Sequence, residues 1–233
     1  IFKDFSSGKG GNVVSFVMEH EHYSYPEALR YLAEKYNIEI EEEEQTPESI
    51  QRMNERESLF IVCAFAQKYF SQQLHETEEG RSVALSYFVE RGFREDIIEQ
   101  FGLGYCPDTW DRFTNEALEQ GYAIEFLEKA GLTNVKEDKR FDFLRGRVTF
   151  PIHNLTGKVI GFGARTLKSD DRGPKYLNSP ESDIYNKSKV LYGIYQAKNE
   201  IAKLENCYLV EGYTDVLSMH QAGVANVVAS SGT

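Results

Sequence analysis

The chain has 233 residues, 41% of them apolar and 27% charged, with a formal net charge of −11. This is the composition of a folded protein with one large domain or two ordinary ones. No apolar run approaches the ~18 residues of a membrane span, and the first residues do not form a signal peptide, so no membrane association is expected.

The three cysteines, Cys63, Cys106 and Cys207, are far apart and form no CxxC pair. Their spacing argues against a disulfide framework and fits a reducing compartment. We therefore expect a cytoplasmic protein.

Charge is unevenly distributed along the chain. Residues 41–60 contain seven Glu and two Arg, a balance of −5, whereas residues 136–189 contain twelve Lys and Arg and seven acids, a balance of +5. The net negative charge counts against a nucleic-acid partner, but a local basic field is what a cleft for a polyanion requires. A solvated basic face explains the charge equally well, and both readings remain open.

The first motif in chain order is KDFSSGKGGN, at residues 3–12. It is not a Walker A loop, because G-x-x-x-x-G-K-[ST] requires Ser or Thr where Gly10 stands. Residues 12–37 then show helical spacing, with a capping box that starts at Ser24 and Pro26 just inside the second helix.

The charge run IEIEEEEQTPES predicts an acidic linker over residues 41–57. The alternative is that Thr46 and Pro47 open the next helix. Residues 47–130 are predicted to be mostly helical, with an apolar stripe over residues 58–74 and a helix C-cap at Gly92. We expect a small helical subdomain whose aromatic residues form a core.

From residue 140 the pattern changes to that of strands. RVTFPIHN and GKVIGFGART are strand-like runs separated by Leu155-Thr156-Gly157, which predicts a hairpin. The turn-rich segment SDDRGPKYLNSPESD contains few apolar residues and is expected to be exposed. The run KVLYGIYQAKNEIAKLE after it predicts a helix.

The C-terminal runs ENCYLVEGYTDVLSMHQAG and VANVVAS predict one parallel βαβ unit. The chain stops directly after a strand, so we expect the sheet to be truncated. The predicted fold class is therefore α+β with an α/β end: a helical subdomain, a mixed β region and the start of a parallel βαβ sheet.

The motif YLVEGYTDV places Glu211 at the C-terminal end of a strand and Asp215 near the first turn of the following helix. Ligands of open α/β sheets lie at such strand ends, and two carboxylates there suit a hard divalent ion such as Mg²⁺. The alternative is that Glu211 only caps the helix, a role worth ~0.3–1 kcal/mol.

The run LVEGYTDVLSMHQAGVANVVASSGT resembles the opening of the Toprim module of bacterial DnaG-type DNA primases. Upstream, GKGGNVVSFVMEHEHYSYPEALRYLAEKYNIEI is similar to the tail of that family's zinc-binding domain, and ERGFREDIIEQFGLGYCPDTWD to its RNA polymerase domain. FLRGRVTFPIHNLTGKVIGFGART and PKYLNSPESDIYNKSKVLYGIY complete the resemblance, which covers essentially the whole chain.

The resemblance divides the chain into four parts. It implies a remnant of the zinc-binding domain over residues 1–40, the acidic linker over 41–57, the N-terminal part of the RNA polymerase domain over 58–204, and a truncated Toprim start over 205–233.

The resemblance also implies a function: synthesis of short RNA primers on single-stranded DNA during bacterial replication. The implied partners are the DNA template, ribonucleoside triphosphates and the replicative helicase; the cofactor is Mg²⁺ or Mn²⁺, and the location is nucleoid-associated. Phosphoryl transfer needs metal ions and cations around the phosphates, and Arg and Lys supply the cations.

Site residues follow motif by motif. Glu211 is the implied metal-binding acid, and Asp215 lies in the same segment. The implied basic positions for nucleic acid or nucleotide are Arg145, Arg147, Arg165, Lys175 and Lys187. In PKYLNSP, Tyr176 and Asn178 would stack on a base or bond a sugar, although packing is the more ordinary role for Tyr176.

The sequence departs from the family in two places. Before GKGGN the family has C-x-x-C, which supplies two zinc ligands, whereas this chain has Asp4 and Ser7. A Ser hydroxyl is a poor zinc ligand, so we expect no zinc. The family's further Toprim acids, an Asp-x-Asp pair, would lie beyond Thr233, so we expect this chain as given to make no primers.

Two rival functions remain. One is a non-catalytic module that binds single-stranded DNA or a helicase. The other is a different Toprim enzyme, a nuclease or topoisomerase, but such an enzyme need not carry RGR or PKYLNSP.

Overall fold

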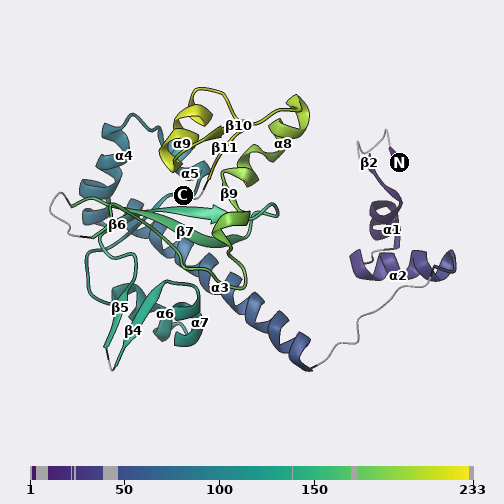
Figure 1. Cartoon of the computed structure of the whole chain (residues 1–233), viewed down its shortest axis with the longest axis horizontal. Coiled ribbons are helices and arrows are strands. Elements are labelled where there is room, and N and C mark those ends of the chain that lie inside the picture. The colour runs from purple at the N-terminus through teal and green to yellow at the C-terminus, as the bar shows by residue number, and fades with distance from the viewer. Residues whose placement is uncertain are drawn as a thin grey trace. The chain divides into compact units, whose positions relative to one another are not determined.

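The structure is a computed structural model that describes residues 2–3, 10–21, 23, 25–38, 47–137, 139–168 and 173–230. The chain divides into two compact units, residues 1–49 and 50–233, and each is described by itself. Figure 1 labels the elements.

The first unit contains a short hairpin and two helices: β1 (Phe2–Lys3), β2 (Gly10–Gly11), α1 (Val13–Glu21) and α2 (Tyr25–Lys35). Asn12 caps α1, because its Oδ1 accepts a hydrogen bond from the Ser15 backbone N–H at 2.9 Å. The helices expected over residues 12–37 are confirmed. Ser24 of the predicted capping box lies outside the described residues.

Helix α3 (Pro47–Glu76) corrects the predicted linker. Residues 47–57 are helical, so the expected linker over 41–57 is wrong in this part, and Pro47 opens the next helix. Proline suits a first helical turn, because its fixed φ matches the helix and its missing N–H has no partner to lose there. Residues 41–46 lie outside the described residues.

The other helices of the second unit are short. They are η1 (Gly80–Leu85), a π-helical turn that continues into α4 (Ser86–Glu90), then α5 (Glu95–Gln100), α6 (Arg112–Glu119), α7 (Ile124–Lys129), the 3₁₀ turn η2 (Lys187–Lys189), α8 (Ile194–Leu204) and α9 (Tyr213–Gln221). Gly92 follows α4 with φ of +81°, as expected of a C-cap glycine.

An antiparallel sheet lies at the centre of this unit, in the order β3-β6-β7-β8. Its strands are β3 (Gly104–Cys106), β6 (Arg147–His153), β7 (Val159–Thr166) and β8 (Tyr176–Asn178). The β6–β7 pairing confirms the predicted hairpin. Strand β8 pairs with β7 and forms one edge of this sheet.

Three further features of the β structure differ from the prediction. Residues 104–106 form β3 within the region predicted to be mostly helical, and β4 (Thr133–Lys136) with β5 (Lys139–Asp142) forms an additional hairpin. The helix expected from Lys189 begins only at Ile194, because β9 (Leu191–Tyr192) pairs with the last strand.

The C-terminal residues form the predicted βαβ unit. β10 (Tyr208–Val210) runs parallel to β11 (Val227–Ser230), and α9 connects them. β9 adds an antiparallel strand, so the sheet order is β10-β11-β9.

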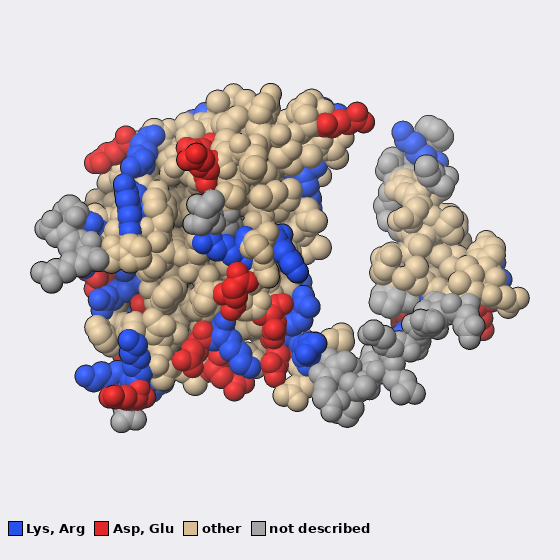
Figure 2. All heavy atoms as spheres, viewed as in Figure 1, with Lys and Arg blue, Asp and Glu red and all other residues tan. Residues whose placement is uncertain are grey.

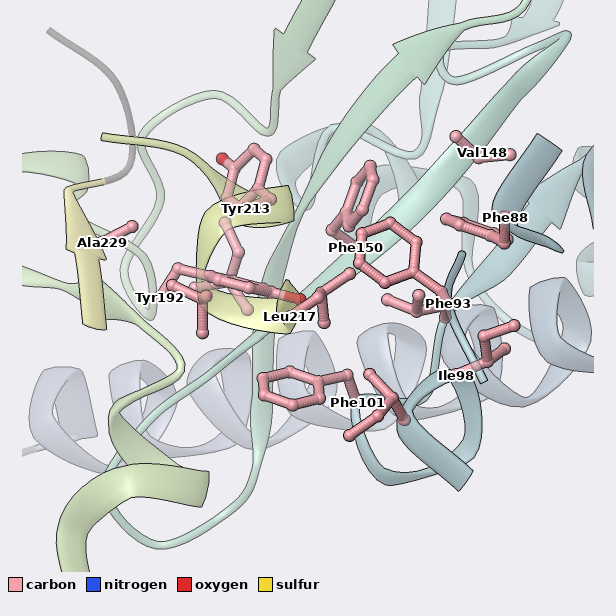
Figure 3. Packing of buried hydrophobic residues seen from close by; sticks show 14 of the residues in the cluster. Phe88, Phe93, Ile98, Phe101, Val148, Phe150, Tyr192, Tyr213, Leu217 and Ala229 are labelled. Carbon is pink, nitrogen blue, oxygen red and sulfur yellow. The ribbon is translucent and has the colours of Figure 1, made fainter. Parts of the chain in front are cut away.

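Two hydrophobic clusters cover the two faces of the central sheet. Phe150 of β6 belongs to one cluster with residues of α4, α5 and α9; its ring contacts the Phe88 ring and stacks on Tyr213, as Figure 3 shows for Tyr213. Phe162 and Ala164 of β7 pack with α3, α6 and α7. The βαβ unit is therefore anchored to the central sheet, which sets the position of the loop after β10 relative to β8.

Candidate nucleic-acid and metal site

Two hollows lie beside the edge strand β8, on opposite faces. Side chains alternate along a strand, so Tyr176 and Asn178 line one hollow and Leu177 lines the other. The acidic cleft, of about 330 Å³, is lined by Tyr176, Asn178, Glu211, Gly212, Tyr213, Asp215 and Ser230. The basic hollow, of about 210 Å³, includes Asp108, Arg145, Arg147, Thr166, Lys168 and Leu177.

Glu211 lies in the acidic cleft directly after strand β10, as predicted. Its side chain is exposed, and Ser230 at the end of the neighbouring strand β11 lines the same cleft. The carboxyl ends of two parallel strands thus meet at this place, which is where open α/β sheets bind ligands.

Asp215 takes the helix-capping role that was the alternative for Glu211. Its Oδ2 accepts a hydrogen bond from the Gly212 backbone N–H at 3.0 Å, at the start of α9. A carboxylate in the first turn also interacts favourably with the helix dipole. One Asp215 oxygen is therefore engaged in the cap, and the carboxylate of Glu211 is the one at the strand end.

Tyr213 ties the acidic cleft to the central sheet. Its hydroxyl donates a hydrogen bond to Asn178 Oδ1 of β8, and its ring stacks on Phe150 with centroids 5.2 Å apart (Figure 3). Gly163 makes this approach possible, since a Cβ there would lie 2.5 Å from the Tyr213 ring. Burial raises the pKa of the Tyr213 phenol, so the hydroxyl stays protonated and can donate.

The donor set of the acidic cleft fits a divalent metal ion. Glu211 and Asp215 supply hard carboxylate oxygens, and Mg²⁺ is commonly held by one or two carboxylates together with water and substrate phosphates. No group of three or more His, Cys, Asp or Glu side chains that could hold an ion by itself occurs in the described part of the chain. Asp4 and Ser7 lie outside the described residues, so the absence of zinc stays a prediction.

In the basic hollow, Arg145 and Arg147 have different surroundings. The guanidinium of Arg145 lies 4.9 Å from the centre of the Trp110 ring, and its Nε is 3.7 Å from Asp108 Oδ1. Arg147 is only 6% exposed, and its Nη1 donates to the backbone carbonyls of Pro174 at 3.0 Å and Lys175 at 3.3 Å. Arg147 thus holds the segment that leads into β8, and its contact with nucleic acid stays a prediction.

The other predicted cations do not line either hollow, as far as the structure describes the chain. Arg165 pairs with Tyr176 across β7 and β8, and its guanidinium lies 4.6 Å from the Tyr87 ring centre. Lys175 is exposed just before β8. Lys187 lies in the 3₁₀ turn η2, and its backbone N–H donates a hydrogen bond to Glu181 Oε1.

The surroundings of Tyr176 are compatible both with stacking on a base and with packing. Its side chain is 41% exposed in the acidic cleft, while Arg165 lies 6.0 Å from its ring centre. Asn178 lines the same cleft, and its Oδ1 accepts a hydrogen bond from the Tyr213 hydroxyl.

Sequence reasoning missed four residues of the site: Asp108, Trp110, Lys168 and Tyr213. Trp110 carried a usable signal, because it is the single Trp of the chain and is 52% exposed, which is unusual for so large an apolar side chain. Lys168 was counted only as part of the basic segment.

The surface is not uniformly charged. Figure 2 shows one face on which Lys and Arg side chains are interspersed with Asp and Glu.

Among the described residues, no helix is long and apolar enough to cross a membrane.

Family comparisons agree with this fold. A model described as the N-terminal domain of the DNA primase catalytic core matches residues 69–198, and a Toprim-like model matches residues 208–233. A CHC2 zinc finger model matches residues 1–48. The fold is thus that of a primase catalytic core that leads into a Toprim-like module. The chain belongs to the DnaG-type DNA primase family, and this membership implies use of a divalent metal ion.

Curated relatives carry the same description. The DNA primases of Halalkalibacterium halodurans and Clostridium acetobutylicum are each 40% identical to this chain over its whole length. The chain spans 38% of the length of each of them.

Solved structures of primases are similar as well. The RNA polymerase domain of Mycobacterium tuberculosis primase has a TM-score of 0.73 and 41% identity, over 76% of this chain and 57% of that one. The Aquifex aeolicus primase, with zinc-binding and RNA polymerase domains, has a TM-score of 0.70 and 30% identity, over 100% of this chain and 54% of that one. A DnaG primase catalytic domain bound to single-stranded DNA has a TM-score of 0.71 and 36% identity, over 78% of this chain and 56% of that one.

Proposed function

We propose that this chain is part of an enzyme that synthesises short RNA primers on a single-stranded DNA template. The observation that carries the proposal is the arrangement at β8. The strand-end carboxylate of Glu211 lies on one face, and the exposed cations Arg145 and Lys168 lie on the other. A polynucleotide that crosses the edge of β8 would contact both hollows. The similarity to a primase catalytic domain bound to single-stranded DNA supports such a template.

Each side chain then has a chemical role. Glu211 would hold Mg²⁺ or Mn²⁺, which supplies charge stabilisation for phosphoryl transfer when bound. Asp215 would help to hold the metal through its second oxygen. Arg145 provides a bidentate fork for a phosphate, and Trp110 beside it a stacking surface for a base.

The residues around β8 complete the proposal. Tyr176 would stack on a base and Asn178 would bond a sugar, in the same cleft as Glu211. Arg147 positions the backbone before β8, while Arg165, Lys175 and Lys187 would offset phosphate charge. The substrates would be ribonucleoside triphosphates, and the replicative helicase would be a partner of the whole protein.

A second candidate describes the chain taken alone: a module that binds single-stranded DNA without chemistry. It is favoured by the acidic cleft, where the described residues supply two carboxylates and one of these is engaged in a helix cap. A two-metal site needs more oxygen ligands than this. We therefore propose that the chain alone binds template but makes no primers.

Fluorescence anisotropy with a labelled single-stranded oligonucleotide tests the nucleic-acid part. Replacing Arg145 and Lys175 together by Ala should weaken binding and reduce the salt slope by about 1 to 2, since each phosphate contact adds about 0.7 for single strands. Equal binding by this variant and the unchanged chain would show that neither Arg145 in the basic hollow nor Lys175 before β8 contacts the template.

Two further measurements test the metal and the chemistry. Electron paramagnetic resonance should detect Mn²⁺ bound by the chain and a clear loss of affinity in Glu211→Gln, because one carboxylate ligand is removed. A primer-synthesis assay on the chain should give no product. Product above a Glu211→Ala control would contradict the view that the chain alone is inactive.

A further inference from the structure

Asp108 lies in the basic hollow with one carboxylate oxygen directed toward each of two cations. Arg145 Nε is 3.7 Å from Oδ1, and Lys168 Nζ is 2.5 Å from Oδ2. An anionic group that presents separate oxygens to an Arg and a Lys is arranged as a phosphate would be at such a site. The carboxylate thus occupies a place between two cations that suits a phosphate.

The position of Asp108 is set by the backbone on both sides. The Gly146 N–H donates to the carbonyls of Cys106 at 3.0 Å and Pro107 at 3.3 Å, and a Cβ at Gly146 would lie 3.1 Å from Asp108 Oδ1. Glu79 Oε1 accepts two hydrogen bonds, from the Tyr105 hydroxyl at 2.6 Å and from the Asp108 backbone N–H at 3.4 Å. The loop therefore holds this carboxylate over the Arg-Gly-Arg turn through contacts that do not involve the cations.

The ion pairs are open to solvent. The side chains of Asp108, Arg145 and Lys168 are 36%, 37% and 55% exposed. Ion pairs of such exposure contribute little to folding, so the fold does not depend on them. A polyanion from solution can therefore reach both cations and compete with the carboxylate for them.

We propose that Asp108 limits the affinity of the basic hollow for phosphate groups, such as those of nucleic acid. Its carboxylate neutralises Arg145 and Lys168 in the unbound protein, and a phosphate of the template must displace it. The inference rests on the proposed function of this hollow and deepens it. Its consequence is weaker, more readily reversed template binding than the two cations would give by themselves.

The substitution Asp108→Asn tests this directly, because Asn has the same shape and removes only the charge. Single-stranded DNA should bind about fivefold more tightly at low salt, as expected from removal of a competing surface ion pair. The salt slope should become steeper by about 1, because one more cation can engage phosphate.

Asp96→Asn is the matched control. Asp96 is exposed on α5 and pairs with Arg94 at 3.0 Å, and it does not line the basic hollow. Its replacement changes the net charge by the same amount, so any difference between the variants reports the position of Asp108. The effect of Asp108→Asn should also disappear when Arg145 and Lys168 are both replaced by Ala.

A second probe separates this inference from the proposed function. Inorganic tripolyphosphate can be titrated against the fluorescence of Trp110, the single Trp of the chain, which lies against Arg145. Tighter tripolyphosphate binding by Asp108→Asn, without any DNA binding, would support the inference and contradict the proposed function. If Asp108→Asn and Asp96→Asn behave alike with both probes, or if Asp108→Asn binds more weakly, the inference is wrong.

Discussion

At the scale of single residues, Tyr213 connects the two halves of the acidic cleft. It is the first residue of α9, two positions after Glu211, and its hydroxyl reaches Asn178 on β8. Its ring is buried against Phe150 and against Tyr192, whose ring centre is 4.7 Å away. The same side chain therefore serves the core and fixes the loop that carries Glu211.

Tyr213→Phe should lower the free energy of unfolding by about 1 kcal/mol, because a buried hydrogen bond is lost while the ring remains. It should also weaken Mn²⁺ binding, since the Glu211 loop loses its tie to β8. Urea denaturation and electron paramagnetic resonance measure the two effects.

Tyr192→Phe is the control for this prediction. Tyr192 lies in the same cluster, and its hydroxyl is buried without a hydrogen-bond partner in the described part of the chain. Removing that hydroxyl should leave stability unchanged or raise it. Equal losses in both variants would show that the Tyr213–Asn178 hydrogen bond does not stabilise the fold.

At the scale of elements, the site depends on how closely α9 approaches the β6–β7 pair. Gly163 lies in β7 opposite Phe150 and Asn178, and the Tyr213 ring takes the space where a side chain would be. Helix α9 therefore packs directly against the backbone of β7 at Gly163. Because α9 follows Glu211 directly, this contact also sets the distance between Glu211 and β8.

Gly163→Ala should destabilise the protein by about 1–3 kcal/mol, because the added methyl group would lie 2.5 Å from the Tyr213 ring and force it to move. Gly161→Ala, two residues earlier on β7, should cost less, since its nearest neighbours, Ser179 and the Tyr185 ring, would lie at 3.2 and 3.3 Å rather than 2.5 Å. Thermal unfolding compares the two. A larger loss for Gly161→Ala would contradict the proposed contact.

At the scale of the whole molecule, stability couples to pH through the half-buried His153. Burial lowers the pKa of His153, in β6, to about 4, against its ordinary value of 6.5. Between these values the unfolded chain binds a proton that the folded chain does not. The stabilisation is therefore fully present above pH 6.5 and is lost as pH falls toward 4.

His153→Phe should reduce this dependence, because Phe keeps the ring that stacks on Tyr195 at 5.8 Å and cannot bind a proton. We expect the loss of unfolding free energy between pH 7 and 4 to be smaller by about 2–3 kcal/mol in the variant. Urea denaturation at the two pH values measures it. The same loss in both proteins would show that another group is responsible.

Most of the helices, the β6–β7 hairpin and the βαβ unit were predictable, because each depends on apolar period and on turn residues within one segment. β3, β9 and the β4–β5 hairpin were not. β3 and β9 have three and two residues and form by pairing with strands far away in the chain, so no local pattern marks them. The start of α3 at Pro47 was only an alternative, since a charge run suits an exposed helix and a linker equally well.

The sequence by itself determined the family, the strand-end place of Glu211 and the basic character of residues 136–189, since motifs and local charge carry these. Only the tertiary structure decided that Arg147 is buried under the segment before β8, that Asp215 caps α9, and that Asp108 lies between Arg145 and Lys168. The reason is physical: Asp108, Arg145 and Lys168 come from separate loops, and only the fold brings them within a few ångströms of one another. Whether a charged side chain binds a ligand, a backbone group or another charge depends on that proximity, which residue type and spacing do not specify.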